Sequence, residues 1–95
     1  MAAYLIANVE VTDHAAYEEY KQKVAATIAA YGGRYLARGG RTETLEGDWS
    51  LKRCVILEFA TVEQLKAWWS SPEYRPLREL RQRTTRSNLV VVEGI

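Results

Sequence analysis

The chain has 95 residues, of which 47% are hydrophobic and 26% charged, and its formal net charge is +1. This length fits one folded domain over residues 1–95, and the near-neutral charge gives no general attraction to nucleic acid or to an anionic membrane. The single cysteine, Cys54, excludes an internal disulfide and a site built from several thiolates. No apolar run approaches the ~20 residues of a membrane helix, and no signal peptide is evident, so we expect a cytoplasmic protein.

The first third of the chain predicts a strand followed by an amphipathic helix. Residues 3–11 alternate as a half-buried strand does. Thr12 and Asp13 offer an N-cap for the helix, and Gly32-Gly33 ends it where a positive φ is needed. The apolar positions of this helix form one stripe; they are Tyr17, Tyr20, Val24, Thr27, Ile28 and Tyr31.

The middle of the chain predicts two strands separated by a polar segment. The second strand runs over residues 34–38, and the Gly39-Gly40 pair interrupts it. We expect the polar residues up to Leu45 to continue as a bent strand and residues 46–49 to turn. Residues 53–59, "RCVILEF", have the β-propensity of a third strand.

The last third predicts two helices and a closing strand. Thr61 opens a helix with Gln64 at the capping-box position, and Ser71-Pro72 starts a short helix that reaches about Gln82. The segment "NLVVVEGI", residues 88–95, closes the chain as a strand. The resulting order β-α-β-β-α-β predicts an α+β, ferredoxin-like antiparallel sheet with helices on one face and a short extra helix before the last strand. Because strands three and four are apolar on both faces, we expect a homodimer that stacks two sheets.

Five segments in this order resemble the family of domain of unknown function 1330, in the dimeric α/β-barrel group of ferredoxin-like folds. They are "VTDHAAYEEY", "YGGRYLARGG", "LEGDW", "VILEF" and "WWSSPEYRPLRELR". The resemblance covers nearly the whole chain and implies this fold and a homodimer, but no activity. His14 stands where the family usually has proline, and both residues fit the first turn of a helix.

Two features that attract attention have structural explanations. His14 is the only histidine, and a first-turn position favours a surface residue over a catalytic base. The segment Arg38-Gly39-Gly40-Arg41 does not feed a helix, as a phosphate loop must, and a single RGG is not a disordered RNA-binding tract. A β-bulge is the favoured interpretation. Such a bulge can re-aim Arg38 toward a cavity, where it would bind an anionic group.

The aromatic residues on the helices predict either an aromatic core or a small-molecule pocket. Tyr17, Trp69 and Tyr74 can converge between the helices and the sheet, where buried hydroxyl and indole groups require partners. A pocket lined by them would suit a small aromatic or polar ligand. In this hypothesis Tyr17 and Tyr74 donate hydrogen bonds and Trp69 forms a wall.

Glu58 is a carboxylate within an apolar strand, so it is either paired or raised in pKa. The structural interpretation pairs it with Arg78 or Arg81. The functional interpretation makes Glu58 a general base, with Arg38 or Arg53 holding an anionic substrate. Asn8, a polar position on strand one, is expected to orient the ligand.

Monooxygenases of the same fold group, which degrade haem or oxidise quinols, use a strand-one Asn with a helix Trp and a His. Asn8 and either Trp68 or Trp69 match this set, but the later helix has no histidine, so an oxygenase is the less favoured expectation. Two hypotheses remain. One is an enzyme without metal or cofactor, with Glu58 and Tyr17 as catalytic residues. The other is a non-catalytic ligand-binding or accessory dimer.

Overall fold

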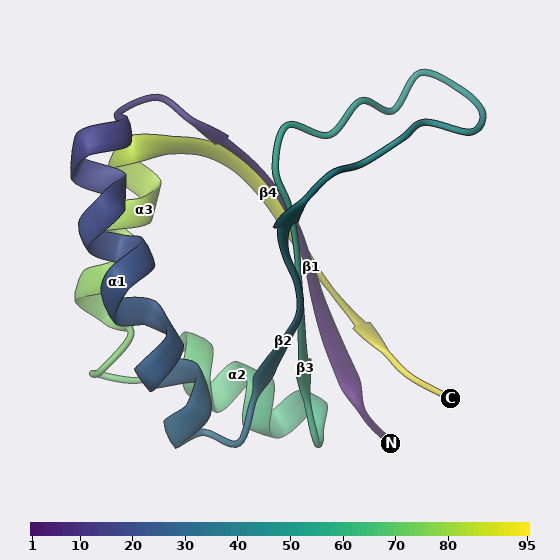
Figure 1. Ribbon diagram of the computed structural model, residues 1–95. Coiled ribbons are helices and arrows are strands. Elements are labelled where there is room, and N and C mark those ends of the chain that lie inside the picture. Colours follow the sequence, from purple (N-terminus) through teal and green to yellow (C-terminus); the bar gives the residue numbers. More distant parts are fainter.

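The computed structural model describes all 95 residues and confirms the ferredoxin-like α+β fold. Three helices cover one face of a four-stranded antiparallel sheet, and the other face carries no helix (Figure 1). We call this uncovered side the open face. The sheet order is β2-β3-β1-β4, and the sheet does not close into a barrel. The elements are β1 (Ala3–Val11), α1 (His14–Ala30), β2 (Arg34–Gly40), β3 (Cys54–Phe59), α2 (Val62–Trp69), α3 (Arg75–Thr84) and β4 (Thr85–Glu93).

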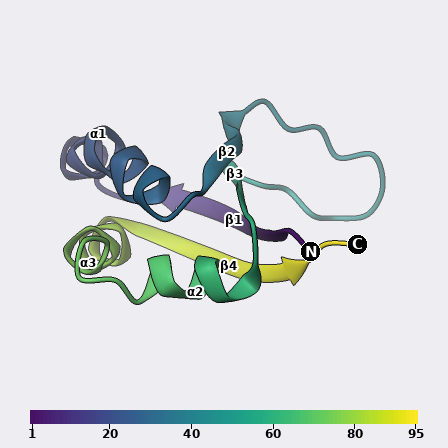
Figure 2. The same cartoon turned by 90° about the horizontal axis from the view of Figure 1, so that it is seen from below.

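The two long helices, α1 and α3, lie side by side against the sheet, and the loop between β2 and β3 projects away from them (Figure 2). This loop spans residues 41–53, so the predicted bent strand up to Leu45 is wrong. Every residue from Arg41 to Ser50 is exposed, Leu45 and Trp49 included, and none of them belongs to a strand. None of the helices is both long and apolar enough to span a membrane.

The helix signals in the sequence act largely as predicted. The side chain of Asp13 accepts a hydrogen bond from the Ala16 amide at 3.1 Å and caps α1. Gly32, with φ of +78°, follows the end of that helix. Thr61 caps α2 by accepting from the Gln64 amide at 3.0 Å. The Gln64 side chain does not complete the capping box, because it donates to the Tyr31 carbonyl at 3.2 Å and ties α2 to the end of α1.

The last two elements begin elsewhere than predicted. Ser71 caps a turn and not the helix, since its hydroxyl accepts from the Tyr74 amide at 3.1 Å and α3 starts at Arg75. The last strand begins at Thr85 and not at Asn88. Its first residues are polar, yet they continue the ladder with β1, where Thr85 pairs with Val11. Backbone pairing therefore extends this strand beyond its apolar part.

The core lies between the sheet and the helices. Trp68 of α2 is at its centre, with its ring 4.0 Å from that of Tyr74 and 5.6 Å from that of Phe59, measured between centroids. Its indole Nε1 donates to the Thr27 hydroxyl at 3.1 Å, so its one polar group is satisfied. The sheet contributes the inward-facing residues Ala3, Leu5, Ala7, Val9, Leu57 and Phe59, all of which are buried.

Strand β2 contains two irregularities that change which side chains face the helices. Its register against β3 shifts between Tyr35 and Ala37 and again between Arg38 and Gly40. The second shift, with Gly39 at φ of +73°, confirms the predicted bulge. Tyr35 pairs opposite Leu57 and so lies on the helix side of the sheet. The first shift then brings Arg38 opposite Val55, on the same side.

Candidate functional site

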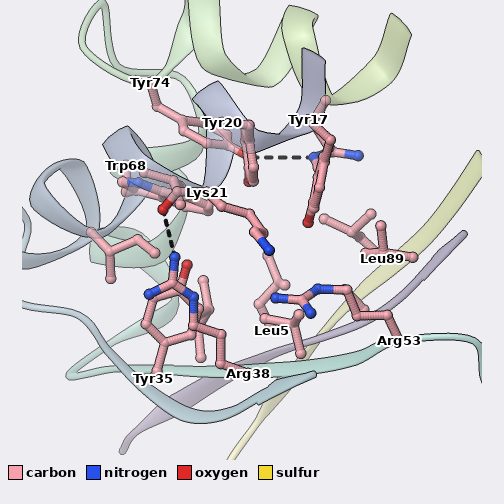
Figure 3. A pocket seen from close by; sticks show the side chains of 17 residues that line it. Leu5, Tyr17, Tyr20, Lys21, Tyr35, Arg38, Arg53, Trp68, Tyr74 and Leu89 are labelled. Carbon is pink, nitrogen blue, oxygen red and sulfur yellow. Dashed lines mark hydrogen bonds between the residues drawn. The ribbon is translucent and has the colours of Figure 1, made fainter. Parts of the chain in front are cut away.

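A small cavity lies between α1, α3 and the inner face of the sheet, and Figure 3 shows its lining. The volume within which the centre of a water molecule can move is about 30 Å³, which is enough for one or two water molecules. Trp68 and the surrounding tyrosines fill the rest of the interior. The lining consists of apolar residues of the strands and α1 together with Tyr17, Tyr20, Tyr35, Tyr74, Lys21, Arg38, Arg53 and Arg81.

A chain of buried polar groups forms the back wall of the cavity. The hydroxyls of Tyr20 and Tyr74 are 2.9 Å apart, and Nε of the buried Arg81 donates to the Tyr74 hydroxyl at 3.4 Å. Burial, and then the neighbouring Tyr74, raise the pKa of Tyr20 well above its ordinary value. Tyr20 therefore stays protonated and serves as a hydrogen-bonding group and not as a base.

Two other phenols face the cavity without a partner in the protein. Neither the Tyr17 nor the Tyr35 hydroxyl makes a hydrogen bond to another residue, although both rings line the cavity. Tyr17 stacks on Tyr20 with ring centroids 5.3 Å apart, which fixes its orientation. Burial raises the pKa of Tyr35, while the neighbouring Arg38 opposes this effect. These two hydroxyls are available to a ligand.

A larger hollow adjoins the cavity at the end of the sheet where β1 leads into α1. This outer hollow has about 370 Å³ of space for water-sized spheres, which is within the range of small-molecule sites. Val9, Tyr17, Lys21 and Arg53 line both spaces, so the two spaces adjoin one another. We call the inner cavity and the outer hollow together the crevice.

Cations predominate around the crevice. Lys21, Arg38, Arg53 and Arg81 are among the 17 residues of the inner cavity, and none of the 17 is acidic. The Arg38 guanidinium donates to the Lys21 carbonyl at 2.6 Å and lies 4.6 Å from the centre of the Tyr35 ring. Arg38 thus links β2 to α1 across the mouth.

Arg53 occupies the boundary between the inner cavity and the outer hollow. Its Nε is buried and has no hydrogen-bond partner, and it is the only buried side-chain nitrogen or oxygen atom in the chain of which this is true. Its guanidinium packs where a side chain on residue 39 would lie, so that only Gly39 leaves room for it. Gly39 therefore has two effects: it allows the positive φ of the bulge, and it leaves room for the Arg53 guanidinium.

Two residues expected in the pocket lie instead on the open face. Glu58 forms a salt bridge with Arg34 at 2.7 Å. The structural interpretation, in which Glu58 is paired, is right, but its partner is Arg34 and not Arg78 or Arg81. Asn8 accepts from the Lys52 amide at 2.9 Å and lines a hollow of the open face beside Trp49. The alternation of β1 and β3 causes this placement, because Asn8 and Glu58 have the opposite parity to the buried Leu5 and Leu57.

Trp69 is half-buried at the edge of the crevice and does not line it. Its ring is flanked by the guanidinium groups of Arg78 at 5.2 Å and Arg81 at 5.7 Å. Its carbonyl accepts from Arg78 at 2.8 Å. The structure therefore brings together four of the seven residues predicted for a site, which are Tyr17, Arg38, Arg53 and Tyr74.

The sequence reasoning missed Lys21 and Tyr35. Lys21 follows Tyr17 by four residues on α1, so the spacing places it on the same helix face. Tyr35 lies opposite the inward-facing Leu57, and the alternation of β2 before its first irregularity predicts this. Both patterns are visible in the sequence, but placing these two side chains in one cavity requires knowing which face of the sheet the helices cover.

The fold and the crevice define a small ferredoxin-like protein with a site of aromatic and basic residues between its helices and its sheet. The chain belongs to the family described as domain of unknown function DUF1330, which it matches over residues 2–95. No curated protein gives a significant sequence match.

Solved structures show the same fold at low sequence identity. A protein of unknown function from Rhodopseudomonas palustris is 19% identical with a TM-score of 0.80, and the match covers 99% of this chain and 82% of that one. SnoaB, a cofactor-independent oxygenase from Streptomyces nogalater, is 13% identical with a TM-score of 0.67, covering 99% and 93%. A dimeric ferredoxin-like protein of unknown function from Jannaschia sp. CCS1 is 14% identical with a TM-score of 0.68, covering 99% and 100%. These likenesses establish the fold alone.

Proposed function

We propose that this protein is a homodimer of single-domain chains, each of which binds a small organic molecule with an aromatic or other apolar body in its crevice. The observation that carries the proposal is the pair of phenol hydroxyls, of Tyr17 and Tyr35, that face the inner cavity without protein partners. A few convergent polar groups on otherwise apolar walls are typical of small-molecule sites. The inner cavity is too small for a ring, so the body of the ligand occupies the outer hollow.

The homodimer is supported by the open face. Several large apolar side chains there are exposed to solvent, with exposed fractions of 38% for Ile6, 49% for Leu36 and 58% for Val90. Ile6 and Val90 are directly paired across β1 and β4, so they form one continuous apolar surface. A patch of this kind favours association, and the similar protein from Jannaschia is described as dimeric.

Catalysis without a cofactor is a second candidate, and the likeness to the cofactor-independent oxygenase SnoaB favours it. In this case Tyr17 is the catalytic residue, because its hydroxyl reaches the site. Glu58 is engaged with Arg34 on the other face of the sheet and does not reach the crevice of its own chain. Turnover that survives Glu58→Gln and is lost in Tyr17→Phe would support this candidate.

An NMR titration with benzamide, a neutral aromatic probe, tests the proposed function. We expect saturable shifts of the backbone amides around Val9, Tyr17 and Arg53, and weaker binding to Tyr17→Phe because one hydrogen-bond donor is lost. Tyr4→Phe is the matched control, since Tyr4 lies on the open face. Shifts confined to the open face, or no saturation, would refute a ligand site in the crevice. Native mass spectrometry of the purified protein would reveal a co-purified molecule.

A further inference from the structure

We propose that the crevice selects organic acids, and that Arg53, Lys21 and Arg38 bind the ligand's carboxylate at the boundary between the inner cavity and the outer hollow. This inference rests on the proposed function and adds the chemical class of the ligand. It also assigns a part to Lys21 and to Gly39, neither of which was predicted from the sequence to take part in binding.

The first argument is the charge of the crevice. The inner cavity has four cationic side chains and no carboxylate in its lining. The chain has only three salt bridges, and Arg38, Arg53 and Arg81 take part in none of them. Like charges held together in a partly buried space repel one another, and an anion between them removes this repulsion. The chain itself supplies no such anion to Arg38 or Arg53.

The second argument is the unsatisfied Nε of Arg53. A buried donor without an acceptor is unfavourable, and native structures contain few such groups. Nε and a terminal nitrogen of a guanidinium form a planar fork that matches the two oxygens of a carboxylate. Arg53 lines both parts of the crevice, so a carboxylate that enters from the outer hollow meets its guanidinium. Nε itself is buried, and the guanidinium must turn toward the hollow for Nε and a terminal nitrogen to donate together.

The neighbours of Arg53 complete the carboxylate site. The amino group of Lys21 points into the same space as the Arg53 guanidinium, and the guanidinium of Arg38 lies on the β2 side (Figure 3). Lys21 also contacts Glu18 at 3.3 Å, but the Glu18 side chain is 55% exposed and that of Lys21 38%, so solvent weakens the contact and Lys21 can turn to a ligand.

The apolar part of the outer hollow favours an organic acid over a free inorganic anion. Val9, Val11 and Tyr17 form apolar walls beside the cations, and such walls bind the body of a molecule and not a hydrated ion. One carboxylate, Glu10, lies on the rim. It disfavours multiply charged anions such as phosphate more than a singly charged carboxylate.

Gly39 controls the position of the Arg53 guanidinium. A Cβ atom at residue 39 would collide with that guanidinium, and Gly39 has φ of +73° in the bulge. Gly39→Ala therefore displaces the Arg53 head group while leaving every charge of the chain in place. This variant separates the geometry of the site from its net charge.

The experiment compares benzoate with benzamide, its neutral counterpart of the same shape, by NMR titration of the dimeric protein. We expect benzoate to bind more tightly than benzamide. Arg53→Met should weaken benzoate binding about tenfold or more and leave benzamide within about twofold, because only the anion uses the charged fork. Gly39→Ala should weaken benzoate in the same direction. Arg83→Met, which removes an exposed cation of α3 outside the crevice, is the control for net charge and should change neither.

Several results would overturn the proposal. Equal affinities for benzoate and benzamide would overturn the carboxylate site and leave the proposed function standing. Equal weakening of benzoate by Arg53→Met and Arg83→Met would show a general charge effect and no site. Inorganic phosphate that competes as well as benzoate would exclude selection for an organic acid. Failure of both probes to bind in the crevice would refute the proposed function together with the inference.

Discussion

Replacing Tyr20 with phenylalanine removes one hydroxyl group from the centre of the protein and tests the polar back wall of the crevice. The Tyr20 side chain is 8% exposed, and its hydroxyl is 2.9 Å from that of Tyr74. Tyr74 would keep only the 3.4 Å contact with Arg81. We expect Tyr20→Phe to lower the free energy of unfolding by about 1 kcal/mol at pH 7, the usual net value of a hydrogen bond.

The effect of Tyr20→Phe should shrink and then reverse at high pH. Burial and the neighbouring Tyr74 raise the pKa of Tyr20 in the folded protein, whereas an unfolded tyrosine has a pKa of about 10. Below pH 10 both states are protonated and the stabilisation is fully present. Above pH 10 the unfolded state loses its proton first, so the wild type loses about 1.4 kcal/mol per pH unit through this group. Phenylalanine has no proton to lose, so the difference between the proteins should vanish at about pH 10.7.

Urea unfolding followed by circular dichroism at neutral pH and at several values up to about pH 11 measures this difference. Other tyrosines and lysines titrate in both proteins and cancel in the comparison. Val24→Ala is the control, because Val24 is a core residue of α1 without a titratable group, and its destabilisation should not change with pH. If the effect of Tyr20→Phe is the same at pH 7 and pH 11, then the Tyr20 phenol is not held protonated in the folded state.

Two further predictions concern the open face and the glycines. Val90→Glu should convert the proposed dimer to a monomer at micromolar concentration in light scattering, because an unpaired charge buried at an interface weakens association by roughly a hundredfold or more. Gln22→Glu, on the exposed side of α1, is its control and should stay dimeric. Gly33→Ala should destabilise the protein by about 1–3 kcal/mol, since its Cβ would lie 2.5 Å from the Phe59 ring. In contrast, Gly40→Ala, with open space around it, should be neutral or stabilising by up to about 1 kcal/mol in thermal unfolding; equal effects at the two glycines would contradict this packing.

The fold could be predicted because its signals are local. Period-two alternation identified β1 and separated its two faces, and caps such as Asp13 and Thr61 located two of the helix starts. The start of β4 could not be found in this way, because Thr85 and its neighbours are polar and are held in the strand by pairing with β1. Pairing between strands that are far apart in the sequence produces no periodic pattern of residues within either strand.

The site was predicted only in part because strand alternation defines two faces without saying which one the helices cover. In β3 both faces are largely apolar, so the sequence grouped Glu58 with Ile56 but did not show that this group faces away from the helices. For Arg38 the alternation predicts the wrong face. Regular alternation from Tyr35 would place it on the open face, and the irregularity at Leu36 turns it to the crevice. A register shift of one residue reverses the face of every side chain that follows it.

The segment Arg38-Gly39-Gly40 shows how backbone irregularity and charge combine in this fold. The irregular register of β2 turns Arg38 inward, and the missing side chain of Gly39 makes room for Arg53 from the neighbouring strand end. Gly33 is also tightly packed, but against an aromatic ring and an apolar side chain of the core. The same Gly→Ala change should therefore act on stability alone at residue 33, whereas at residue 39, where φ is +73°, it should lower both stability and ligand affinity. A loss of benzoate affinity in Gly39→Ala, measured under conditions where the variant is fully folded, would separate these two functions of glycine.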